Sequence, residues 1–254
     1  MPSASGAIAS CLPKPPVAPQ KPALFLDLDG VLAPLAPTPD AVGPDARRTD
    51  VLTRLTDRLQ GRVAIVSGRT LNEIDRISDG AARAASGVHG LQRRRGDGSL
   101  ANRTPDPAVR RAVAAFDAFA AERPGVLVED KELSAGLHYR QAPGVSGEAL
   151  ALAASLARET GLALQPGSMV LELKTPGTDK GVALTAFMAE APFQGATPIM
   201  VGDDLTDEHG FEAAEALGGF GVLVGPERPT AARYSLEDVA AVLDWLDQIA
   251  GGPA

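Results

Sequence analysis

The chain lacks most of the features that mark secreted, membrane-bound or nucleic-acid-binding proteins. Among its 254 residues there is one cysteine, Cys11, which excludes an internal disulfide and fits a reducing compartment. Aromatic residues make up 4% of the chain, which argues against a protein that binds bases by stacking. The net charge is −8, and residues 93–95 form the only long basic run, so neither nucleic acid nor a membrane surface is an expected partner.

Long apolar runs are also missing, and none approaches the roughly 20 residues that a transmembrane helix needs. Residues 1–22 are rich in Ala, Ser and Pro, and the repeated prolines interrupt the continuous apolar stretch of a secretory signal. We interpret residues 1–22 as a disordered leader in which Cys11 is inert. A cytoplasmic location follows by default, and a monomer is compatible with the sequence.

What the chain does have is an alternation of short apolar segments and amphipathic segments, with 44% hydrophobic residues overall. This alternation predicts an α/β fold in which helices cover a parallel sheet. We expect strands at 23–28, 62–66, 197–201 and 220–224, and helices at 45–60, 71–77, 179–188, 211–217 and 236–249.

The middle of the chain has a different pattern. It predicts a helix at 107–123, an antiparallel hairpin at 125–131 and 136–140, a helix at 147–160 and a strand at 168–174. We therefore expect a small α+β unit inserted into the larger sheet, able to open and close over a site. The predicted domains are a leader at 1–22, a core at 23–102 and 175–254, and an inserted unit at 103–174.

Acidic residues gather where two of the predicted core strands end. Asp27 and Asp29 end the first strand before a turn at Gly30, and a second cluster follows strand 197–201 with Asp203, Asp204 and Asp207. In open α/β sheets ligands bind at the carboxyl ends of strands, and converging carboxylates suit Mg2+. Taken singly, Asp29 is explained about as well by turn chemistry as by a role in the site, and Asp203 and Asp204 about as well by helix capping.

Two further residues complete an ordered set, with Ser67 at the end of the second strand and Lys180 at the start of a helix. An acidic pair, then Ser, then Lys, then a second acidic cluster resembles the haloacid dehalogenase-like (HAD) phosphatases. The resemblance covers residues 23–225 and implies a Rossmann-like core with an inserted α+β cap of the C2B type.

The resemblance also implies a role for each residue in phosphoryl transfer. It implies that Asp27 is the nucleophile and a Mg2+ ligand, and that Asp29 binds the metal through its backbone carbonyl while its carboxyl serves as general acid and base. Ser67 and Lys180 would contact the phosphoryl oxygens. The acids of the second cluster divide their roles: Asp203 would complete the metal ligands, and Asp207 would order metal-bound water or Lys180.

Charged pairs with a spacing of two occur in each predicted strand of the inserted unit: Glu129 with Lys131, His138 with Arg140, and Glu172 with Lys174. On a strand this spacing places both members on one face. The face would suit a polyhydroxylated ligand, although a solvated face with cross-strand ion pairs is slightly favoured by spacing alone.

A more specific resemblance shifts that balance. Several motifs look like those of the trehalose-6-phosphate phosphatase family: Ser67-Gly68-Arg69, Gly87-Val88-His89-Gly90, Val128-Glu129-Asp130-Lys131, Leu137-His138-Tyr139-Arg140, Glu172-Leu173-Lys174, Gly177-Thr178-Asp179-Lys180-Gly181 and residues 202–208. The small departure is Val31, where the family often has Thr.

This resemblance implies a phosphatase that hydrolyses trehalose 6-phosphate in the last step of trehalose synthesis. It implies that six residues of the inserted unit hold the disaccharide: Glu129, Lys131, His138, Arg140, Glu172 and Lys174. The alternatives are the same fold acting on sucrose phosphate or a glycosyl-phosphoglycerate, and a non-catalytic regulatory subunit of a trehalose synthase. Intact catalytic residues argue against the regulatory subunit.

Three residues keep open interpretations. Arg69 is a candidate substrate contact that either reaches the inserted unit or pairs with an acid. A structural role in a glycine-flanked turn is favoured for His89 over a role in the site. Trp245 is assigned to packing and surface, as is His209.

Overall fold

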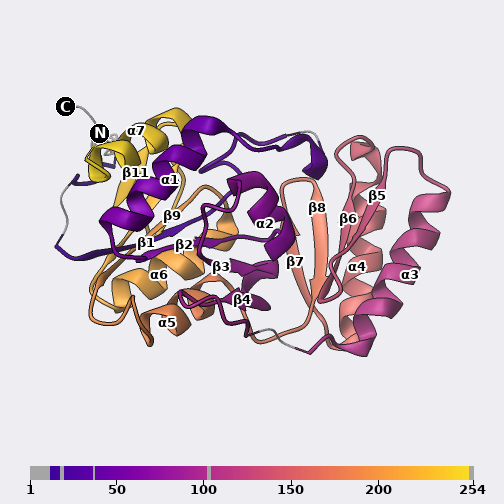
Figure 1. The fold of residues 1–254 in the computed structure, drawn as a ribbon. Helices are drawn as coiled ribbons and strands as arrows, with labels where there is room; N and C mark the ends of the chain where they lie inside the picture. Colours follow the sequence, from indigo (N-terminus) through magenta and orange to yellow (C-terminus); the bar gives the residue numbers. More distant parts are fainter. Residues whose placement is uncertain (1–11, 18–19, 37, 102–103, 252–254) are drawn as a thin grey trace, which may run out of the picture.

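The structure is a computed structural model that describes residues 12–17, 20–36, 38–101 and 104–251. Two separate sheets organise these residues, each with its own helices (Figure 1). Cys11, the subject of one prediction, lies outside the described residues.

The larger sheet has seven strands in the order β11-β10-β9-β1-β2-β3-β4. Neighbouring strands are parallel except for β4, which runs antiparallel to β3 at one edge. The strands are β1 (Pro22–Leu26), β2 (Val63–Val66), β3 (Ala84–Gly87), β4 (Gln92–Arg94), β9 (Thr197–Gly202), β10 (Phe220–Val224) and β11 (Tyr234–Leu236). Because β1 lies between β2 and β9, the ends of these three strands meet at one place.

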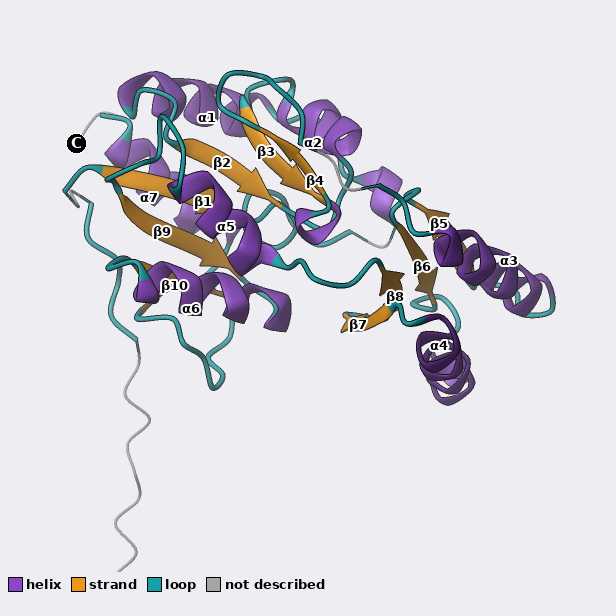
Figure 2. Ribbon diagram, turned by 90° about the horizontal axis from the view of Figure 1, so that it is seen from below, coloured by secondary structure: helices purple, strands orange, loops and turns teal. Residues whose placement is uncertain are grey.

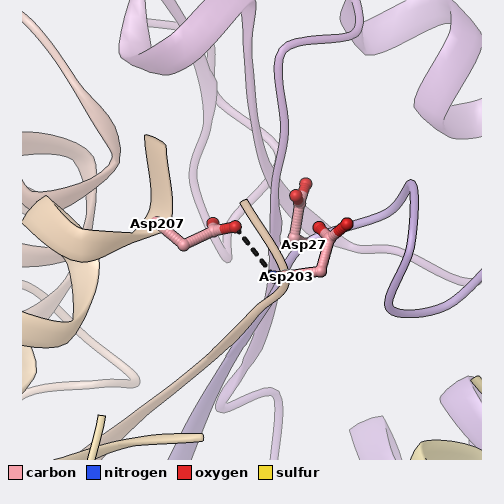
Figure 3. Close-up of side chains that lie close together, drawn as sticks. All are labelled: Asp27, Asp203 and Asp207. Atoms are coloured by element: carbon pink, nitrogen blue, oxygen red, sulfur yellow. Dashed lines mark hydrogen bonds between the residues drawn. The ribbon is translucent and has the colours of Figure 1, made fainter. Parts of the chain in front are cut away.

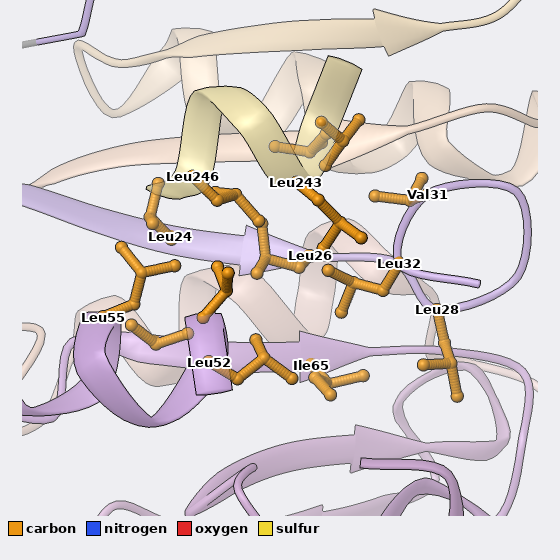
Figure 4. Close-up of a cluster of buried hydrophobic side chains, with 14 of the residues drawn as sticks. Leu24, Leu26, Leu28, Val31, Leu32, Leu52, Leu55, Ile65, Leu243 and Leu246 are labelled. Atoms are coloured by element: carbon orange, nitrogen blue, oxygen red, sulfur yellow. The ribbon is translucent and has the colours of Figure 1, made fainter. Parts of the chain in front are cut away.

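Helices cover both faces of this sheet (Figure 2). One face packs against α1 (Ala46–Arg58), α2 (Leu71–Ser78) and α7 (Val239–Ile249), where Leu26, Leu52 and Leu246 belong to a single buried cluster (Figure 4). The other face packs against α5 (Lys180–Met188) and α6 (Glu208–Ala216) through a cluster that includes Phe25 and Phe187. Alternate residues of β1 therefore enter opposite cores, as the period of a strand requires.

The helices begin where the sequence supplies a capping side chain. Asp45 accepts a hydrogen bond from the backbone N–H of Arg48 at the start of α1, and Thr70 with Glu73 forms a capping box at α2. Asp179 caps α5 in the same way. This cap places Lys180 in the first turn of α5.

The smaller sheet is antiparallel, with the strand order β5-β6-β8-β7. Its strands are β5 (Leu127–Asp130), β6 (Ser134–His138), β7 (Ala163–Gly167) and β8 (Val170–Lys174), and its helices are α3 (Pro107–Ala121) and α4 (Ser146–Thr160). The two helices pack on one face of the sheet, where Leu137, Leu173 and Phe116 share a third buried cluster. These elements span residues 107–174 and form the inserted unit, which is predicted from sequence at 103–174.

These features confirm the predicted α/β fold with a mainly parallel sheet covered by helices. The predicted hairpin is present as β5 and β6. The exact domain boundaries stay a prediction. Four strands that the sequence did not reveal are β3, β4, β7 and β11, and the last helix starts at Val239 because Leu236 belongs to β11.

The interpretation of residues 1–22 as a disordered leader is wrong for residues 12–16, which contact β11 and α7. The backbone N–H of Ser235 donates to the carbonyl of Pro13 (3.0 Å), and the indole N–H of Trp245 donates to the carbonyl of Pro16 (3.1 Å). The edge strand β11 thereby gains a partner for its exposed backbone. In addition, β1 already begins at Pro22.

Among the described residues, no helix is both long and apolar enough to cross a membrane.

Candidate active site

The central strand β1 ends in the acidic pair. The backbone N–H of Asp27 still donates to the carbonyl of Val201 on β9 (3.0 Å), so the side chain of Asp27 is fixed beside that strand. Gly30 then turns the chain at φ +76°, a conformation that suits glycine. A Cβ at Gly30 would lie 2.1 Å from the carboxylate of Asp203, so this glycine also makes room for the second acidic cluster.

Three carboxylates converge at this point (Figure 3). One oxygen each of Asp27, Asp203 and Asp207 can be chosen so that all three lie within 4.8 Å of one another. Asp27 comes from the end of β1, while the other two follow β9. Parallel neighbouring strands therefore bring together acids that are about 175 positions apart in the chain, as the carboxyl ends of a doubly wound sheet do.

Lys180 is buried in the middle of this acidic group. Its Nζ lies 2.7 Å from Oδ2 of Asp27 and 2.7 Å from Oδ1 of Asp207. The other oxygen of Asp207 accepts hydrogen bonds from the backbone N–H groups of Asp203 and Asp204, each at 3.0 Å. Both oxygens of Asp207 are thus occupied, and this fully buried side chain holds the lysine and the acidic loop in place.

The charges are not balanced by Lys180 alone. Burial, together with the nearby carboxylate of Asp207, raises the pKa of Asp203 to about 7. Burial likewise raises the pKa of Asp27 above its usual range, although Lys180 opposes this effect. Burial lowers the pKa of Lys180, but Asp207 and Asp27 outweigh it and keep the ammonium charged. The site therefore has surplus negative charge, which a divalent cation would neutralise.

The donor set fits a hard cation. Asp27 and Asp203 present carboxylate oxygens, and no nitrogen or sulfur ligand is included in the acidic group found among the described residues. Oxygen-only ligands suit Mg2+. Burial and the neighbouring carboxylates raise the pKa values of these two acids, and a bound cation would favour their charged forms.

Ser67 ends β2 next to the acids, and it is almost completely buried. Its Oγ accepts a hydrogen bond from the backbone N–H of Arg69 (3.2 Å). The guanidinium of Arg69 in turn makes a two-pronged contact with the carboxylate of Asp29, with Nε and Nη2 at 2.7 and 2.8 Å from its oxygens. Arg69 also pairs with Glu73 at 3.1 Å. Of the two open interpretations of Arg69, the structure shows the pair with an acid.

A cleft of about 380 Å3 opens between the larger sheet and the inserted unit. The larger sheet contributes Asp27, Asp29, Ser67, Arg69, Lys180 and Asp203 to its lining. The inserted unit contributes Glu129, Lys131, His138, Arg140, Glu172 and Gln165. The volume lies within the usual range for small-molecule sites.

One face of the smaller sheet is polar and forms the second wall of this cleft. The strand register aligns Glu129, Gly136, Glu172 and Gln165 in one row across four strands. Lys131 lies between the acids, with Nζ at 3.4 Å from Glu129 and 3.5 Å from Glu172. His138 contacts the same carboxylate oxygen of Glu129 at 2.9 Å. Spacing alone slightly favoured a solvated face, but these side chains face the larger sheet across the cleft.

The comparisons with known proteins agree with this arrangement. A family model described as trehalose-phosphatase matches residues 25–240. The chain belongs to the trehalose-phosphatase family. The predicted resemblance is therefore confirmed.

Members and relatives of this family match nearly the whole chain. It is 39% identical over 229 residues to the trehalose-6-phosphate phosphatase of Escherichia coli (strain K12), covering 89% of this chain and 86% of that protein. The crystal structure of a trehalose-6-phosphate phosphatase related protein is 26% identical with a TM-score of 0.73, covering 90% and 96% of the two chains. A haloacid dehalogenase-like hydrolase from Bacteroides thetaiotaomicron shares the fold, with a TM-score of 0.62 at 18% identity over 89% and 98%.

Within this trehalose-phosphatase fold, two predicted substrate contacts stand apart from the others. Lys174 does not line the cleft, because its Nζ is buried and donates to the carbonyl of Thr178 (2.9 Å). Arg140 lines the rim, where it donates to the carbonyl of Ser168 (2.9 Å). Their roles in binding stay predictions.

Gln165 and His89 line the cleft but lie outside the predicted set of site residues. Gln165 lies on β7, a strand whose Pro166 and Gly167 hide the alternating pattern. The sequence favours a structural role for His89 over a role in the site, yet its ring lines the cleft and lies 3.3 Å from Glu172. The motif around His89 was the available signal, because an imidazole between two glycines is placed by an unusual turn.

Proposed function

We propose that this protein hydrolyses trehalose 6-phosphate to trehalose and phosphate with Mg2+ as its cofactor. The observation that carries the proposal is the position of the Asp27–Lys180 pair at the base of a cleft whose opposite wall is a polar sheet face. Phosphate chemistry belongs at the charged base, and sugar hydroxyls belong at the polar wall. The named activity of the 39% identical relative supports the same substrate.

Mg2+ would be held by the carboxylates of Asp27 and Asp203 and by the backbone carbonyl of Asp29. Its contribution when bound is positive charge beside the phosphoryl group, which eases the approach of a nucleophile that is itself an anion. Asp207 supports this arrangement from behind, because its two oxygens already bind Lys180 and the acidic loop.

The chain's own residues divide the remaining work. A carboxylate oxygen of Asp27 attacks phosphorus and forms an aspartyl phosphate, which splits one difficult step into two. Lys180 neutralises part of the charge on the phosphoryl oxygens and holds Asp27 in line. Ser67 donates a hydrogen bond from its hydroxyl group to another of the phosphoryl oxygens.

Asp29 donates a proton to the leaving sugar oxygen and later takes one from the attacking water. Its carboxylate is bound by Arg69 in the present arrangement, with both oxygens engaged. The reaction therefore requires the Asp29 carboxyl to leave Arg69 and turn into the cleft. A phosphate dianion in the cleft is a competing partner for the same guanidinium.

The polar face recognises the sugar. Carboxylates of Glu129 and Glu172 accept hydrogen bonds from hydroxyls, while Lys131 and His138 donate. Burial opposes ionisation of Glu172, but Lys131 and His89 lower its pKa so that it is a pure acceptor near neutral pH.

The test is phosphate release from trehalose 6-phosphate, sucrose 6-phosphate and glucose 6-phosphate, with and without Mg2+. We expect turnover of trehalose 6-phosphate to exceed that of the other two and to require Mg2+. Asp27→Asn is the control, since it keeps the shape of the side chain and removes the nucleophile; its turnover should vanish while its circular dichroism spectrum is unchanged.

Each rival has its own outcome in this panel. Preferred turnover of sucrose 6-phosphate would assign the fold to another sugar phosphate. No phosphate release from any substrate, together with binding of trehalose 6-phosphate, would indicate the regulatory subunit. Turnover by Asp27→Asn would mean that Asp27 is not the nucleophile.

A further inference from the structure

His89 occupies an unusual turn at the wall of the cleft. It lies in the short helical turn Val88–Gly90 that follows β3, and both Val88 and His89 have left-handed backbones, with φ of +47° and +50°. Non-glycine residues in this region are uncommon and cluster where function requires them. The ring is buried, with 11% of the side chain exposed.

The imidazole connects the larger sheet to two strands of the inserted unit. Its Nε2 lies 3.3 Å from a carboxylate oxygen of Glu172 on β8 and 2.9 Å from the amide nitrogen of Gln165 on β7. Its Nδ1 is buried and has no hydrogen-bond partner among the described residues. A proton on Nδ1 would therefore be unsatisfied, so the neutral ring carries it on Nε2 and donates it to Glu172.

This tautomer also orients Gln165. The structure places the amide nitrogen of Gln165 opposite Nε2, but two donors cannot pair. With Nε2 as a donor, the amide is therefore assigned with its oxygen toward the ring, where it shares the N–H with Glu172, and its nitrogen toward the cleft. Burial lowers the pKa of His89, which agrees with a neutral ring. The imidazole of His89 thus orients an acceptor, the carboxylate of Glu172, and a donor, the amide nitrogen of Gln165, on the polar face.

The backbone of His89 is tied to the segment that leads out of the inserted unit. Thr178 donates its hydroxyl to the carbonyl of His89 (3.0 Å), and Lys174 donates to the carbonyl of Thr178 (2.9 Å). This chain of contacts gives buried Lys174 a function away from the cleft: it anchors the linker at the same turn.

The loop that carries Ser67 also packs against the His89 ring. A Cβ on Gly68 would lie 2.4 Å from Nε2 of His89, so glycine at this position gives the ring its path to the inserted unit. Lys131 crosses the cleft to donate to the carbonyl of Gly68 (3.0 Å). The phosphate end and the sugar end of the cleft therefore meet at His89.

We propose that His89 is a positioning residue that orients Glu172 and Gln165 for the sugar while it fixes the inserted unit against the loop of Ser67. This inference rests on the proposed function and extends it to a residue outside the predicted catalytic and sugar-binding sets. It makes the contact at His89 a determinant of selectivity for a disaccharide phosphate over a phosphate ester without a sugar.

A pair of variants separates this role from general packing. Asparagine tolerates a left-handed backbone, but its side chain is too short to reach Glu172. Glutamine places an N–H donor close to the position of Nε2. We expect His89→Asn to lose about 10- to 100-fold in kcat/KM for trehalose 6-phosphate, mainly through KM, as for a lost hydrogen bond to a charged group.

The comparison substrate is p-nitrophenyl phosphate, which has no sugar. Its loss in His89→Asn should be at least about tenfold smaller, and His89→Gln should recover most of the activity on trehalose 6-phosphate. Equal losses on both substrates, or a folded His89→Gln as impaired as His89→Asn, would overturn the proposal. Thermal unfolding of each variant checks that the fold is retained.

Two further variants keep the proposal testable if His89 variants fail to fold. Gln165→Leu removes the partner on β7 and should raise KM for trehalose 6-phosphate; an unchanged KM would contradict the role. Adding His89→Asn to Glu172→Gln should cost little more than Glu172→Gln alone, since one acts through the other, and full additivity would contradict it. A wild-type protein inactive on trehalose 6-phosphate would instead refute the proposed function.

Discussion

Asp207 offers the sharpest test of how the acidic site is built, because both of its oxygens have assigned partners. Oδ1 accepts from Lys180, and Oδ2 accepts from the backbone N–H groups of Asp203 and Asp204. Asparagine has the same shape but one acceptor and one donor. In Asp207→Asn the NH2 group must face either Lys180 or the backbone N–H groups of Asp203 and Asp204. All of these are donors, so the NH2 group cannot form a hydrogen bond with them.

The expected cost follows from what each orientation loses. Turning the NH2 group to Lys180 removes a charged hydrogen bond worth about 1.5–3 kcal/mol, and turning it to the loop leaves two buried N–H groups unsatisfied at about 1–3 kcal/mol each. Asp207 also raises the pKa of Asp27 and Asp203, so its removal relieves some repulsion. We expect a net loss of about 1–3 kcal/mol, or roughly 3–10 °C in Tm.

The assay is urea unfolding of wild-type and variant protein at neutral pH, beside measured turnover. Asp204→Asn is the matched control, because the Asp204 side chain accepts from the backbone N–H groups of Leu205 and Asp207, and asparagine keeps an acceptor oxygen for this cap. Turnover of Asp207→Asn should fall at least about tenfold, since Lys180 loses its second partner. A variant as stable and active as Asp204→Asn would refute this account of Asp207.

Three further changes probe other parts of the molecule. Arg140→Ala should reduce kcat/KM for trehalose 6-phosphate more than for p-nitrophenyl phosphate, and equal losses would remove Arg140 from sugar recognition. Despite its burial, Glu172 has a pKa lowered by Lys131 and His89, so its ionisation stabilises the fold above its ordinary pKa of 4.5, and this stability is lost as pH falls through the lowered value. The unfolding free energy of Glu172→Gln should therefore fall less than that of the wild-type protein on acidification below pH 4.5. Parallel curves of unfolding free energy against pH would contradict the pairing. Trp245→Phe should cost about 0.5–1.5 kcal/mol by removing the hydrogen bond to Pro16, and an unchanged unfolding midpoint would show that the contact is not stabilising.

The fold was predictable where local chemistry and burial agree. β10 has the predicted bounds, and α1 starts next to its Asp45 cap. β3 is built from Ala, Ser and Gly, which have little preference for strands, and β4 has three polar residues. Tertiary pairing creates such strands, so the sequence alone carries no signal for them.

The site was predictable to the same extent. Order along the chain identifies Asp27 and the second acidic cluster, because each follows a strand that ends at the same edge of the sheet, and it identifies Lys180 as the residue that opens α5. The pairing of Asp29 with Arg69 was left open, since contacts between loops depend on side-chain reach. The polar row across the smaller sheet needed the strand order β5-β6-β8-β7, which spacing within single strands does not contain.

The central claim is that Asp27 accepts the phosphoryl group from a sugar phosphate. Its most direct test is rapid acid quenching of the protein during turnover of trehalose 6-phosphate with Mg2+, followed by peptide mass spectrometry. We predict a phosphorylated peptide whose modified residue is Asp27, absent from Asp27→Asn. Phosphate release without any phosphopeptide at Asp27, or with the phosphoryl group on another residue, would contradict the account.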